Sequence, residues 1–349
     1  MRPLSKRPGN PLGARLRQRL GLARRAGSAA RIELATLRDA HERLQARFDL
    51  LLESTSDGLW DVELGERKLM DPANEFIWSE QVRRMVGYGG LLERIELAKD
   101  LSSALAAGAL ELHFQPRVDL ASGRAIGAEA LLRWRDPQRG WVSPGVFIPI
   151  AESRGMICAL GRWVLGEACR QMRAWVDAGL RFPGRLWINL AAQQLEEADL
   201  VASIRGITGA AGIAPGCLAL ELTESGLMAD VEGSIRTMAT LREDGFAIAI
   251  DDFGTGYSSL AYLKRLPADK LKIDMSFVRD MLTDRHDYTI VTTIIGMARN
   301  LGLEVIAEGV EEGAQAQALR SLGCGEAQGY YFGKPVPAEV FAEKWLSAA

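Results

Sequence analysis

The sequence predicts an α/β fold built around a closed sheet of eight strands, and two observations support this. From residue 110 onward, short runs rich in apolar and β-branched residues alternate with amphipathic helical patterns. Repeated β–α units of this length favour a parallel sheet covered by helices. Eight such runs within about 240 residues fit a closed barrel better than an open sheet. We therefore expect a (β/α)8 TIM-like barrel with one antiparallel strand, preceded by an N-terminal helical extension.

The hydrophobic pattern places each strand and the clearest helices. The predicted strands are residues 112–118, 125–133, 186–190, 217–222, 247–251, 270–273, 303–306 and 325–328. Helical patterns cover 161–178, 231–244 and 288–301. The connection between Val118 and Ala125 is too short for the crossover that a parallel pair needs. The first two strands are therefore expected to be antiparallel.

Composition describes an ordinary soluble chain. It has 349 residues, of which 48% are hydrophobic and 25% charged, and its formal net charge of −3 does not indicate duplex nucleic acid as a partner. No apolar run reaches the roughly 20 residues that span a bilayer, and no apolar region follows the charged N-terminus. The four cysteines form no C-x-x-C pair, so disulfides and structural zinc are not expected and a reducing cytoplasm fits.

The first 90 residues divide into three segments. Residues 1–33 form a basic arm, because every ionisable side chain from Arg2 to Arg31 is Arg or Lys. We expect the arm to be disordered, with weak contact to a membrane surface or RNA as the alternative. Residues 34–52 carry a heptad seam of fewer than three repeats, which an amphipathic helix and a coiled-coil dimer explain equally well. The seam is Leu34, Leu37, His41, Leu44, Phe48 and Leu51.

Residues 53–90 contain a polar turn, one alternating run and one short helical pattern, in "ESTSDGLWDVEL" and "PANEFIWSEQVRRMVGY". This stretch resembles the opening of a PAS sensory domain. It stops after about forty residues, whereas a domain that stands alone needs a larger core. We therefore interpret it as an incomplete PAS-like fragment, followed by the main domain at 91–349.

Polar side chains occur in or just after most of the apolar strands. They are Glu129, Asn189, Glu221, Glu224, Asp251, Asp252, Lys272, Glu308 and Gln328. Strand ends of a barrel converge on one face, where buried carboxylates would repel one another without cations. Taken singly, a strand-end Glu is more often an ion-pair partner, and an Asn more often a capping residue. Taken together, the residues favour a site for hard cations such as Mg²⁺ or Mn²⁺.

The adjacent pair Asp251–Asp252 indicates the reaction class. Two hard cations that share an Asp form the usual arrangement for in-line phosphoester displacement. Strand alternation would point the two side chains apart, so the chain must bend after them. Gly254 and Gly256 supply the backbone freedom for that bend.

Residues 91–349 resemble an EAL domain, the bacterial phosphodiesterase module specific for cyclic di-GMP. The motif triplet is Glu129–Ala130–Leu131, within "GAEALLRW". The other segments that carry the resemblance follow in order: "LHFQP", "INLAAQQL", "LELTES", "IDDFGTGYSSL", "LKID", "VIAEGVE" and "EAQGYYFGKP". The resemblance implies hydrolysis of cyclic di-GMP to linear 5′-pGpG.

The resemblance also implies roles for single residues. Two divalent cations would be held by Glu129, Asn189, Glu221, Asp251 and Asp252, with Asp251 between them. The implied catalytic residues, which orient or deprotonate the attacking water, are Lys272, Glu308 and Gln328. The implied substrate contacts are Gln115, Leu131 and Arg133. Glu224 would anchor the loop of residues 253–259 so that both aspartates face the cations.

Two alternatives and one assembly state remain open. A non-catalytic cyclic di-GMP receptor or a scaffold would be expected to have lost ligands, and this sequence keeps the full implied set. Phe114 and Arg117 depart from the usual Tyr and Lys, but both lie outside that set. A homodimer is expected from the heptad seam and from the apolar helix 288–301, which carries Ile290, Ile294, Ile295 and Met297.

Overall fold

The computed structural model describes residues 88–348, apart from residue 229 and residues 255–259. The basic arm and the segment 34–52 lie outside the described residues. So do all but the last three residues of the PAS-like segment. The predictions made for these segments therefore stay predictions. Within the described part of the chain, no helix is long and apolar enough to cross a membrane.

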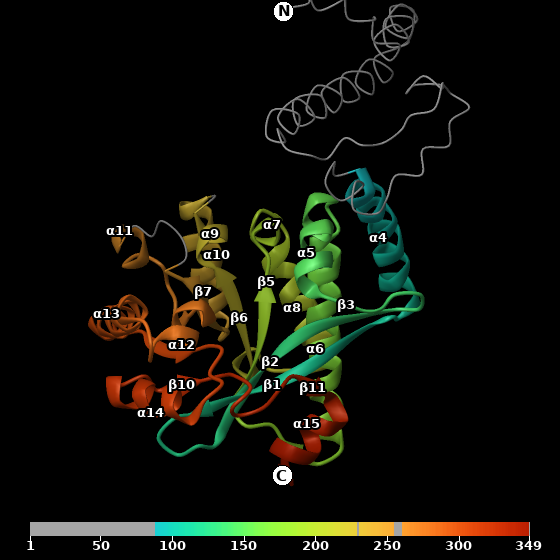
Figure 1. Ribbon diagram of the computed structural model, residues 1–349. Helices are drawn as coiled ribbons and strands as arrows, with labels where there is room; N and C mark the ends of the chain where they lie inside the picture. The colour runs from blue at the N-terminus through green and yellow to red at the C-terminus, as the bar shows by residue number, and fades with distance from the viewer. Residues whose placement is uncertain (1–87, 229, 255–259, 349) are drawn as a thin grey trace, which may run out of the picture. The chain divides into compact units, whose positions relative to one another are not determined.

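Eight strands close into a barrel, and the view in Figure 1 looks at its side. The strands are β1 (Leu110–Asp119), β2 (Ala125–Asp136), β5 (Arg185–Leu190), β6 (Leu218–Thr223), β7 (Ala247–Phe253), β8 (Lys270–Ile273), β9 (Glu304–Ala307) and β10 (Glu326–Ala327). They follow the order β1-β10-β9-β8-β7-β6-β5-β2, and β2 pairs with β1 to close the ring. All eight predicted strands are present, with ends that differ by a few residues.

The reversed strand is β1. It runs antiparallel to both of its neighbours, β2 and β10, whereas all other neighbouring pairs in the ring are parallel. This confirms the antiparallel first pair and the single reversed strand. Four short strands extend or flank the barrel: β3 (Gly140–Val142), β4 (Leu180–Arg181), β11 (Val336–Pro337) and β12 (Ser347–Ala348).

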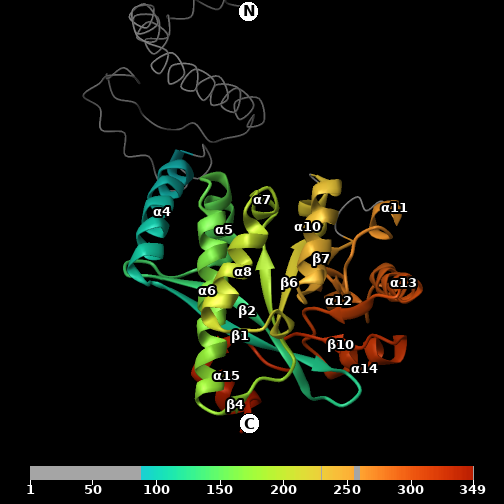
Figure 2. The same ribbon diagram turned by 180° about the vertical axis from the view of Figure 1, so that it is seen from behind.

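Helices surround the strands on the outside of the barrel, as Figures 1 and 2 show from opposite sides. They are α4 (Tyr88–Ala107), α5 (Pro144–Ser153), α6 (Ile157–Asp177), α7 (Ala192–Leu195), α8 (Leu200–Ala211), α9 (Glu224–Leu227), α10 (Val231–Glu243), α11 (Leu260–Leu263), α12 (Met275–Asp280), α13 (Arg285–Leu301), α14 (Gly313–Leu322) and α15 (Ala338–Trp345). A 3-10 turn, η1 (Pro215–Cys217), precedes β6.

Capping residues set the bounds of α13, which was predicted to begin at residue 288. It begins three residues earlier, because the side chain of Asp284 accepts a hydrogen bond from the backbone N–H of His286. It ends at Leu301, and its C-cap Gly302 adopts a left-handed φ of 73°. Ile294 and Ile295 of this helix are buried against its own barrel. They therefore give no separate support for a dimer.

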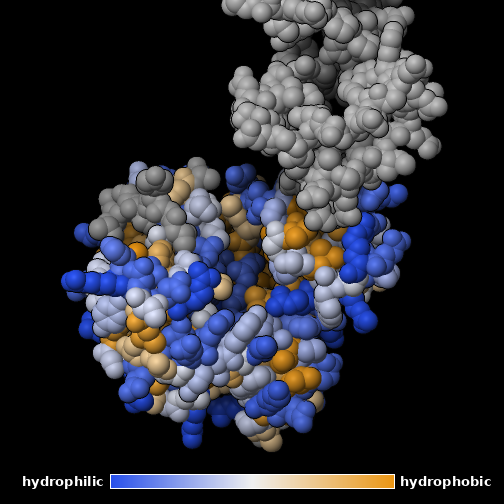
Figure 3. All heavy atoms as spheres, viewed as in Figure 1, coloured by the Kyte–Doolittle hydropathy of each residue, from blue (hydrophilic) through white to orange (hydrophobic). Residues whose placement is uncertain are grey.

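The main core lies between the strands and the helices. A much smaller apolar cluster fills the interior of the barrel toward the end where the parallel strands begin. That inner cluster consists of Trp187, Ala219, Ala247 and Ala249. One large ring surrounded by three alanines fits the narrow lumen of an eight-stranded barrel. On the face of the described residues shown in Figure 3, the surface is mainly hydrophilic and its apolar residues stand in several small groups.

Two glycines let β2 approach β5 closely. A Cβ atom added at Gly127 would lie 2.6 Å from the carbonyl oxygen of Arg185. A Cβ atom added at Gly184 would overlap the carbonyl oxygen of Ile126, and Gly184 also has a left-handed φ of 81°. Because β2 and β5 carry site residues, these glycines set the distance between two walls of the site.

We predict that Gly184→Ala lowers the free energy of unfolding by about 2–4 kcal/mol, because it combines left-handed strain with a backbone clash. Gly179→Ala is the matched control. It has a φ of 69° but nothing within 4 Å of the added atom, so a loss of only about 1 kcal/mol is expected. Urea denaturation of both variants measures the difference. Equal losses would show that the β2–β5 contact tolerates a side chain.

Candidate active site

The predicted strand-end residues come together at one end of the barrel. Pairing between strands explains much of this convergence, since Asn189 on β5 lies opposite Glu221 on β6, and Gln115 on β1 lies opposite Glu129 on β2. The carboxyl ends of parallel barrel strands share one face. The residues that meet there are Gln115, Glu129, Asn189, Glu221, Asp251, Lys272, Glu308 and Gln328.

Lys272 lies at the centre of this group. Its Nζ is 2.6 Å from Glu221 Oε2, 2.8 Å from Asp251 Oδ2 and 2.6 Å from Glu308 Oε1. Glu129 Oε2 is further away, at 4.0 Å. Burial on its own would lower the pKa of Lys272, but the four carboxylates outweigh it and hold the pKa well above its usual value. Lys272 is therefore a permanent cation among buried carboxylates.

Glu129 accepts hydrogen bonds from two side-chain amides. Asn189 Nδ2 donates to its Oε1 at 2.7 Å, and Gln328 Nε2 donates to its Oε2 at 2.7 Å. Burial raises the pKa of Glu129, but Lys272, Arg117 and these two amides together bring it down to about 2. Glu129 is thus ionised at neutral pH.

Arg117 belongs to this site, although it is not among the site residues predicted from the sequence. It is fully buried on β1, and its Nη2 donates to Glu221 Oε1 while its Nε donates to Gln328 Oε1 at 3.1 Å. Arg117 is not one of the implied cation ligands, but it contacts Glu221, which is. The signal that could have found it is its position two residues after Gln115 on the same strand, where alternation gives both side chains one direction.

The pair Asp251–Asp252 bends the chain at the end of β7. Asp252 has a φ of 53°, the one left-handed φ at a non-glycine residue in the described part of the chain. The pairing of β7 with β8 shifts register between Ile250 and Phe253. The bend predicted after the pair therefore lies at Asp252 itself, since only this lets successive side chains leave strict alternation. Gly254 follows with a φ of 96°, and Gly256 lies outside the described residues.

Glu224, at the first position of α9, contacts the same bend. Its Oε2 accepts a hydrogen bond of 3.2 Å from the backbone N–H of Gly254. Glu224 itself is buried. This contact fits the expected anchoring of the loop after Asp252, of which only residues 253 and 254 are described.

The implied substrate residues lie on β1 and β2 beside the carboxylates. Gln115 donates from Nε2 to the carbonyl of Gly333 at 3.0 Å and accepts from Gln328 Nε2 at 2.9 Å. Leu131 and Arg133 are each half-buried on β2. Burial lowers the pKa of Arg133 from its usual value, and its Nη1 donates to the carbonyl of Leu132 at 2.9 Å.

The site carries more negative charge than its own cations can balance. Five carboxylates face two buried cations, Lys272 and Arg117. Burial, together with the neighbouring carboxylates, raises the pKa of Glu221 to about 7 and that of Glu308 to about 8. Burial, and then Asp251, also raise the pKa of Asp252. Carboxylates whose pKa values are raised in this way lack enough positive charge around them, and divalent cations would supply it.

The side chains are not already grouped as metal ligands. Within the described residues, no three of the His, Cys, Asp and Glu side chains are arranged to hold a metal ion. The point on which Glu221, Asp251 and Glu308 converge is the Lys272 ammonium. Cation binding would thus require these carboxylates to turn part of their oxygens away from Lys272.

Residues 98–335 match the EAL domain family. This chain belongs to the EAL domain family. The EAL match covers β1 to β10 and with them every strand-end residue of the site. The triplet Glu129–Ala130–Leu131 lies in β2, where Glu129 enters the carboxylate group.

Two curated relatives of this EAL chain come from Pseudomonas aeruginosa. The bifunctional diguanylate cyclase/cyclic di-GMP phosphodiesterase MucR is 47% identical over 247 residues, which is 71% of this chain and 36% of MucR. The cyclic di-GMP phosphodiesterase NbdA is 44% identical over 251 residues, which is 72% of this chain and 32% of NbdA. The chain thus spans about a third of the length of these relatives.

A solved structure extends the likeness to three dimensions. The phosphodiesterase of P. aeruginosa MucR, in complex with c-di-GMP, has a TM-score of 0.68 and 47% sequence identity. The match covers 70% of this chain and 99% of that one.

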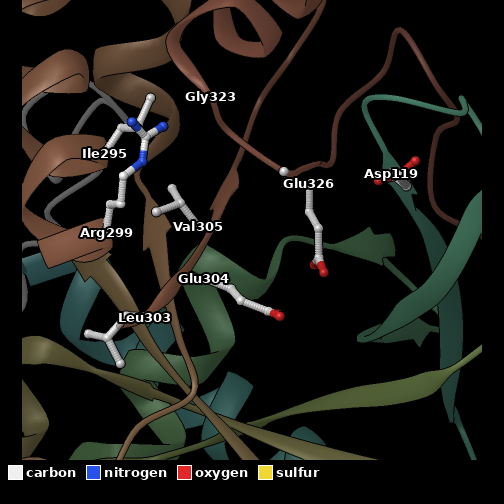
Figure 4. Close-up of a pocket in the computed structure, with 9 residues that line it drawn as sticks. Asp119, Ile295, Arg299, Leu303, Glu304, Val305, Gly323 and Glu326 are labelled. Atoms are coloured by element: carbon white, nitrogen blue, oxygen red, sulfur yellow. The ribbon is translucent and has the colours of Figure 1, made fainter. Parts of the chain in front are cut away.

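A pocket of about 390 Å³ opens at the other end of the EAL barrel, near the starts of β9 and β10 (Figure 4). Its carboxylates Glu304 and Glu326 both pair with Lys270. The end of a barrel where strands begin ordinarily serves stability rather than chemistry. We assign no site there.

The raised pKa of Glu308 makes the free energy of unfolding of the metal-free protein depend on pH. Chelator keeps the protein metal-free in the measurement. Its folded pKa of about 8 lies above its unfolded value of 4.5. The folded state therefore loses stability as pH rises from about 5 to about 8, where the folded carboxyl gives up its proton. In Glu308→Gln this loss is absent, so the unfolding temperature of the variant, relative to wild type, is expected to rise across that window. A difference of 1 kcal/mol corresponds to roughly 2–4 °C.

Glu232→Gln serves as the control, because Glu232 is an exposed carboxylate paired with Arg265. Scanning calorimetry at pH 5.5, 7 and 8.5 measures all three proteins. A difference between Glu308→Gln and wild type that stays constant with pH would contradict the prediction.

Proposed function

We propose that this chain hydrolyses cyclic di-GMP to linear 5′-pGpG with two divalent cations, Mg²⁺ or Mn²⁺. The observation that carries the proposal is the convergence of four carboxylates around one buried lysine, three of them at 2.6–2.8 Å and Glu129 at 4.0 Å. The family supports it, since MucR is named as a cyclic di-GMP phosphodiesterase and its phosphodiesterase structure contains c-di-GMP. The whole set of implied residues is retained here.

The cation ligands in this proposal come from neighbouring strands. Glu129, Asn189, Glu221 and Asp251 would hold one ion, and Asp251 with Asp252 the other, with Glu308 beside it. All are oxygen donors, which suits Mg²⁺ and Mn²⁺. When bound, the ions would supply neutralisation of phosphoryl charge and a more acidic attacking water.

The reaction needs one water and breaks one bond. The water oxygen attacks phosphorus, the P–O3′ bond breaks, and the leaving O3′ takes up a proton. The water proton must pass to a nearby base. Glu308 suits that role, because Lys272 Nζ contacts its Oε1 at 2.6 Å and holds the carboxylate beside Asp251. Lys272 supplies a fixed positive charge beside the phosphoryl oxygens.

Gln328 acts on the ligands rather than on bulk solvent. It is buried, and its amide is held by Arg117, Gln115 and Glu129. We propose that it orients Glu129 and, through Gln115, joins the ligand group to the substrate side of the site. Gln115, Leu131 and Arg133 would there contact the dinucleotide, with Arg133 near a phosphate oxygen or a guanine edge.

The proposal also covers the cellular compartment and the N-terminal segments. The four cysteines are free thiols, which suits a reducing cytoplasm. We propose that residues 91–349 act as the phosphodiesterase domain. Residues 1–33 would form a basic arm with weak membrane contact. Residues 34–52 would form a helix or a dimer stalk, and residues 53–90 an incomplete PAS-like fragment.

Hydrolysis of cyclic di-GMP by the purified protein tests the proposal. We expect 5′-pGpG with Mg²⁺ or Mn²⁺ and none with chelator. Glu129→Ala and Asp251→Ala are expected to lower kcat by at least about a thousandfold, because each removes an ion ligand. Glu304→Ala, a carboxylate at the opposite end of the barrel, is the control and should keep wild-type turnover. Tight binding of the dinucleotide without product would favour a receptor instead.

A homodimer is also proposed. Ile294 and Ile295 are buried in the barrel, so the exposed Tyr288, Thr292 and Thr293 of α13 and the seam of 34–52 would have to form the contact. We expect light scattering at micromolar concentration to give twice the chain mass of 38.1 kDa. A monomer across that range would refute the dimer.

A further inference from the structure

Arg117 is a buried cation that the proposed reaction has not used. It lies on the reversed strand β1, has no exposed surface, and places its guanidinium 4.4 Å from the ring centroid of Trp187. Trp187 belongs to the small cluster that fills the interior of the barrel. The guanidinium therefore lies between the ring of Trp187 on one side and the carboxylates of the site on the other.

Arg117 and Lys272 divide the two oxygens of Glu221 between them. Arg117 Nη2 donates to Oε1, and Lys272 Nζ donates to Oε2 at 2.6 Å. Asp251 and Glu308 contact the same Lys272 ammonium. Only Oε2 of Glu221 thus points to the place where the other carboxylates meet, while Oε1 points away toward Arg117.

The same guanidinium fixes the amide of Gln328. Arg117 Nε donates to Gln328 Oε1 at 3.1 Å, so the amide nitrogen of Gln328 must face Glu129 and Gln115. One cation therefore sets the orientation of two groups in the site, a carboxylate on β6 and an amide after β10. Its planar, forked donors suit this double contact better than a single ammonium would.

Stability alone does not explain Arg117. Its Nη1 is buried and has no hydrogen-bond partner among the described residues. A buried ion with an unmade hydrogen bond costs free energy, and apolar residues of similar size often replace buried ion pairs without loss. A residue kept in such a position is better explained by what it does to Glu221 and Gln328.

We propose that Arg117 is a positioning residue that restricts Glu221 to one ligand oxygen and thereby favours Mg²⁺ and Mn²⁺ over Ca²⁺. The inference rests on the cation site of the proposed function. Ca²⁺ takes about 6–8 oxygens and often binds both oxygens of a carboxylate, whereas Mg²⁺ requires a near-ideal octahedron. A carboxylate with one oxygen already bound to a guanidinium cannot offer both to an ion.

Metal binding, measured without substrate, tests this inference. The full chain is stripped with chelator, dialysed, and titrated with Mn²⁺ and with Ca²⁺ by calorimetry. In Arg117→Met the affinity for Mn²⁺ is expected to fall about ten- to a hundredfold, the usual effect of losing a partner behind a metal ligand. The affinity for Ca²⁺ is expected to hold or rise, because Oε1 becomes available. The Mn²⁺:Ca²⁺ affinity ratio therefore falls at least about tenfold.

Two variants serve as controls. Arg117→Lys keeps a cation behind Glu221 and should restore most of the ratio. Arg205→Met removes an exposed arginine that pairs with Asp244 on the outer helices, and should leave the ratio unchanged. Circular dichroism and thermal unfolding establish that each variant is folded.

The outcomes separate the inference from the function on which it rests. A folded Arg117→Met protein with the wild-type ratio overturns the role of Arg117. If that variant does not fold, Trp187→Leu removes the aromatic ring beside the guanidinium and keeps the arginine. A fall in its ratio then supports the role, and an unchanged ratio overturns it. If the wild-type protein binds neither Mn²⁺ nor Ca²⁺, the proposed cation site is refuted, and the inference about Arg117 is refuted with it.

Discussion

Lys272 donates from one buried ammonium to Glu221 and Asp251, and Glu308 contacts it at 2.6 Å. Each of these charges would be costly to bury alone, and removing any one partner would leave the others uncompensated. The barrel meets this requirement because β6, β7, β8 and the residue after β9 place the four groups at one point. The rest of the site is arranged around that constraint. Glu129 stands 4.0 Å from the ammonium and is stabilised by amides, and Arg117 supplies the second cation from below.

The reversed strand β1 connects the constraint to the substrate side. Gln115 lies opposite Glu129 in the antiparallel register, and Arg117 follows two residues later on the same face. A parallel β1 would need a crossover helix and could not be joined to β2 by the five residues between Asp119 and Ala125. The short connection therefore places a glutamine and an arginine inside the barrel. The C-terminal segment completes this side, because the carbonyl of Gly333 accepts from Gln115 and β11 pairs with His113 and Phe114.

The sequence was informative where chemistry and periodicity coincide. Lys272 between Leu271 and Ile273, or Glu221 in "LALELT", breaks an apolar run and leaves few alternatives to a lumen position. The sequence does not single out Arg117, because an arginine near the end of a strand is ordinarily solvated and only the closed barrel makes its position interior. Local rules favour glycine at positive φ and so predict the bend at the glycines after Asp252, whereas tertiary contacts impose the positive φ on Asp252 itself. The apolar pattern of α13 could not distinguish a core face from a dimer face.

The carboxylates of one cluster are driven to opposite protonation behaviour by their neighbours. Burial acts on all of them, but Glu129 also has Lys272, Arg117 and two amide donors, which bring its pKa to about 2. Glu221 and Glu308 share Lys272 with other anions, and burial leaves their pKa values at about 7 and about 8. Without divalent ions, protons therefore neutralise part of the cluster near neutral pH. A divalent cation would have to displace those protons, so its binding would be coupled to proton release at Glu221 and Glu308.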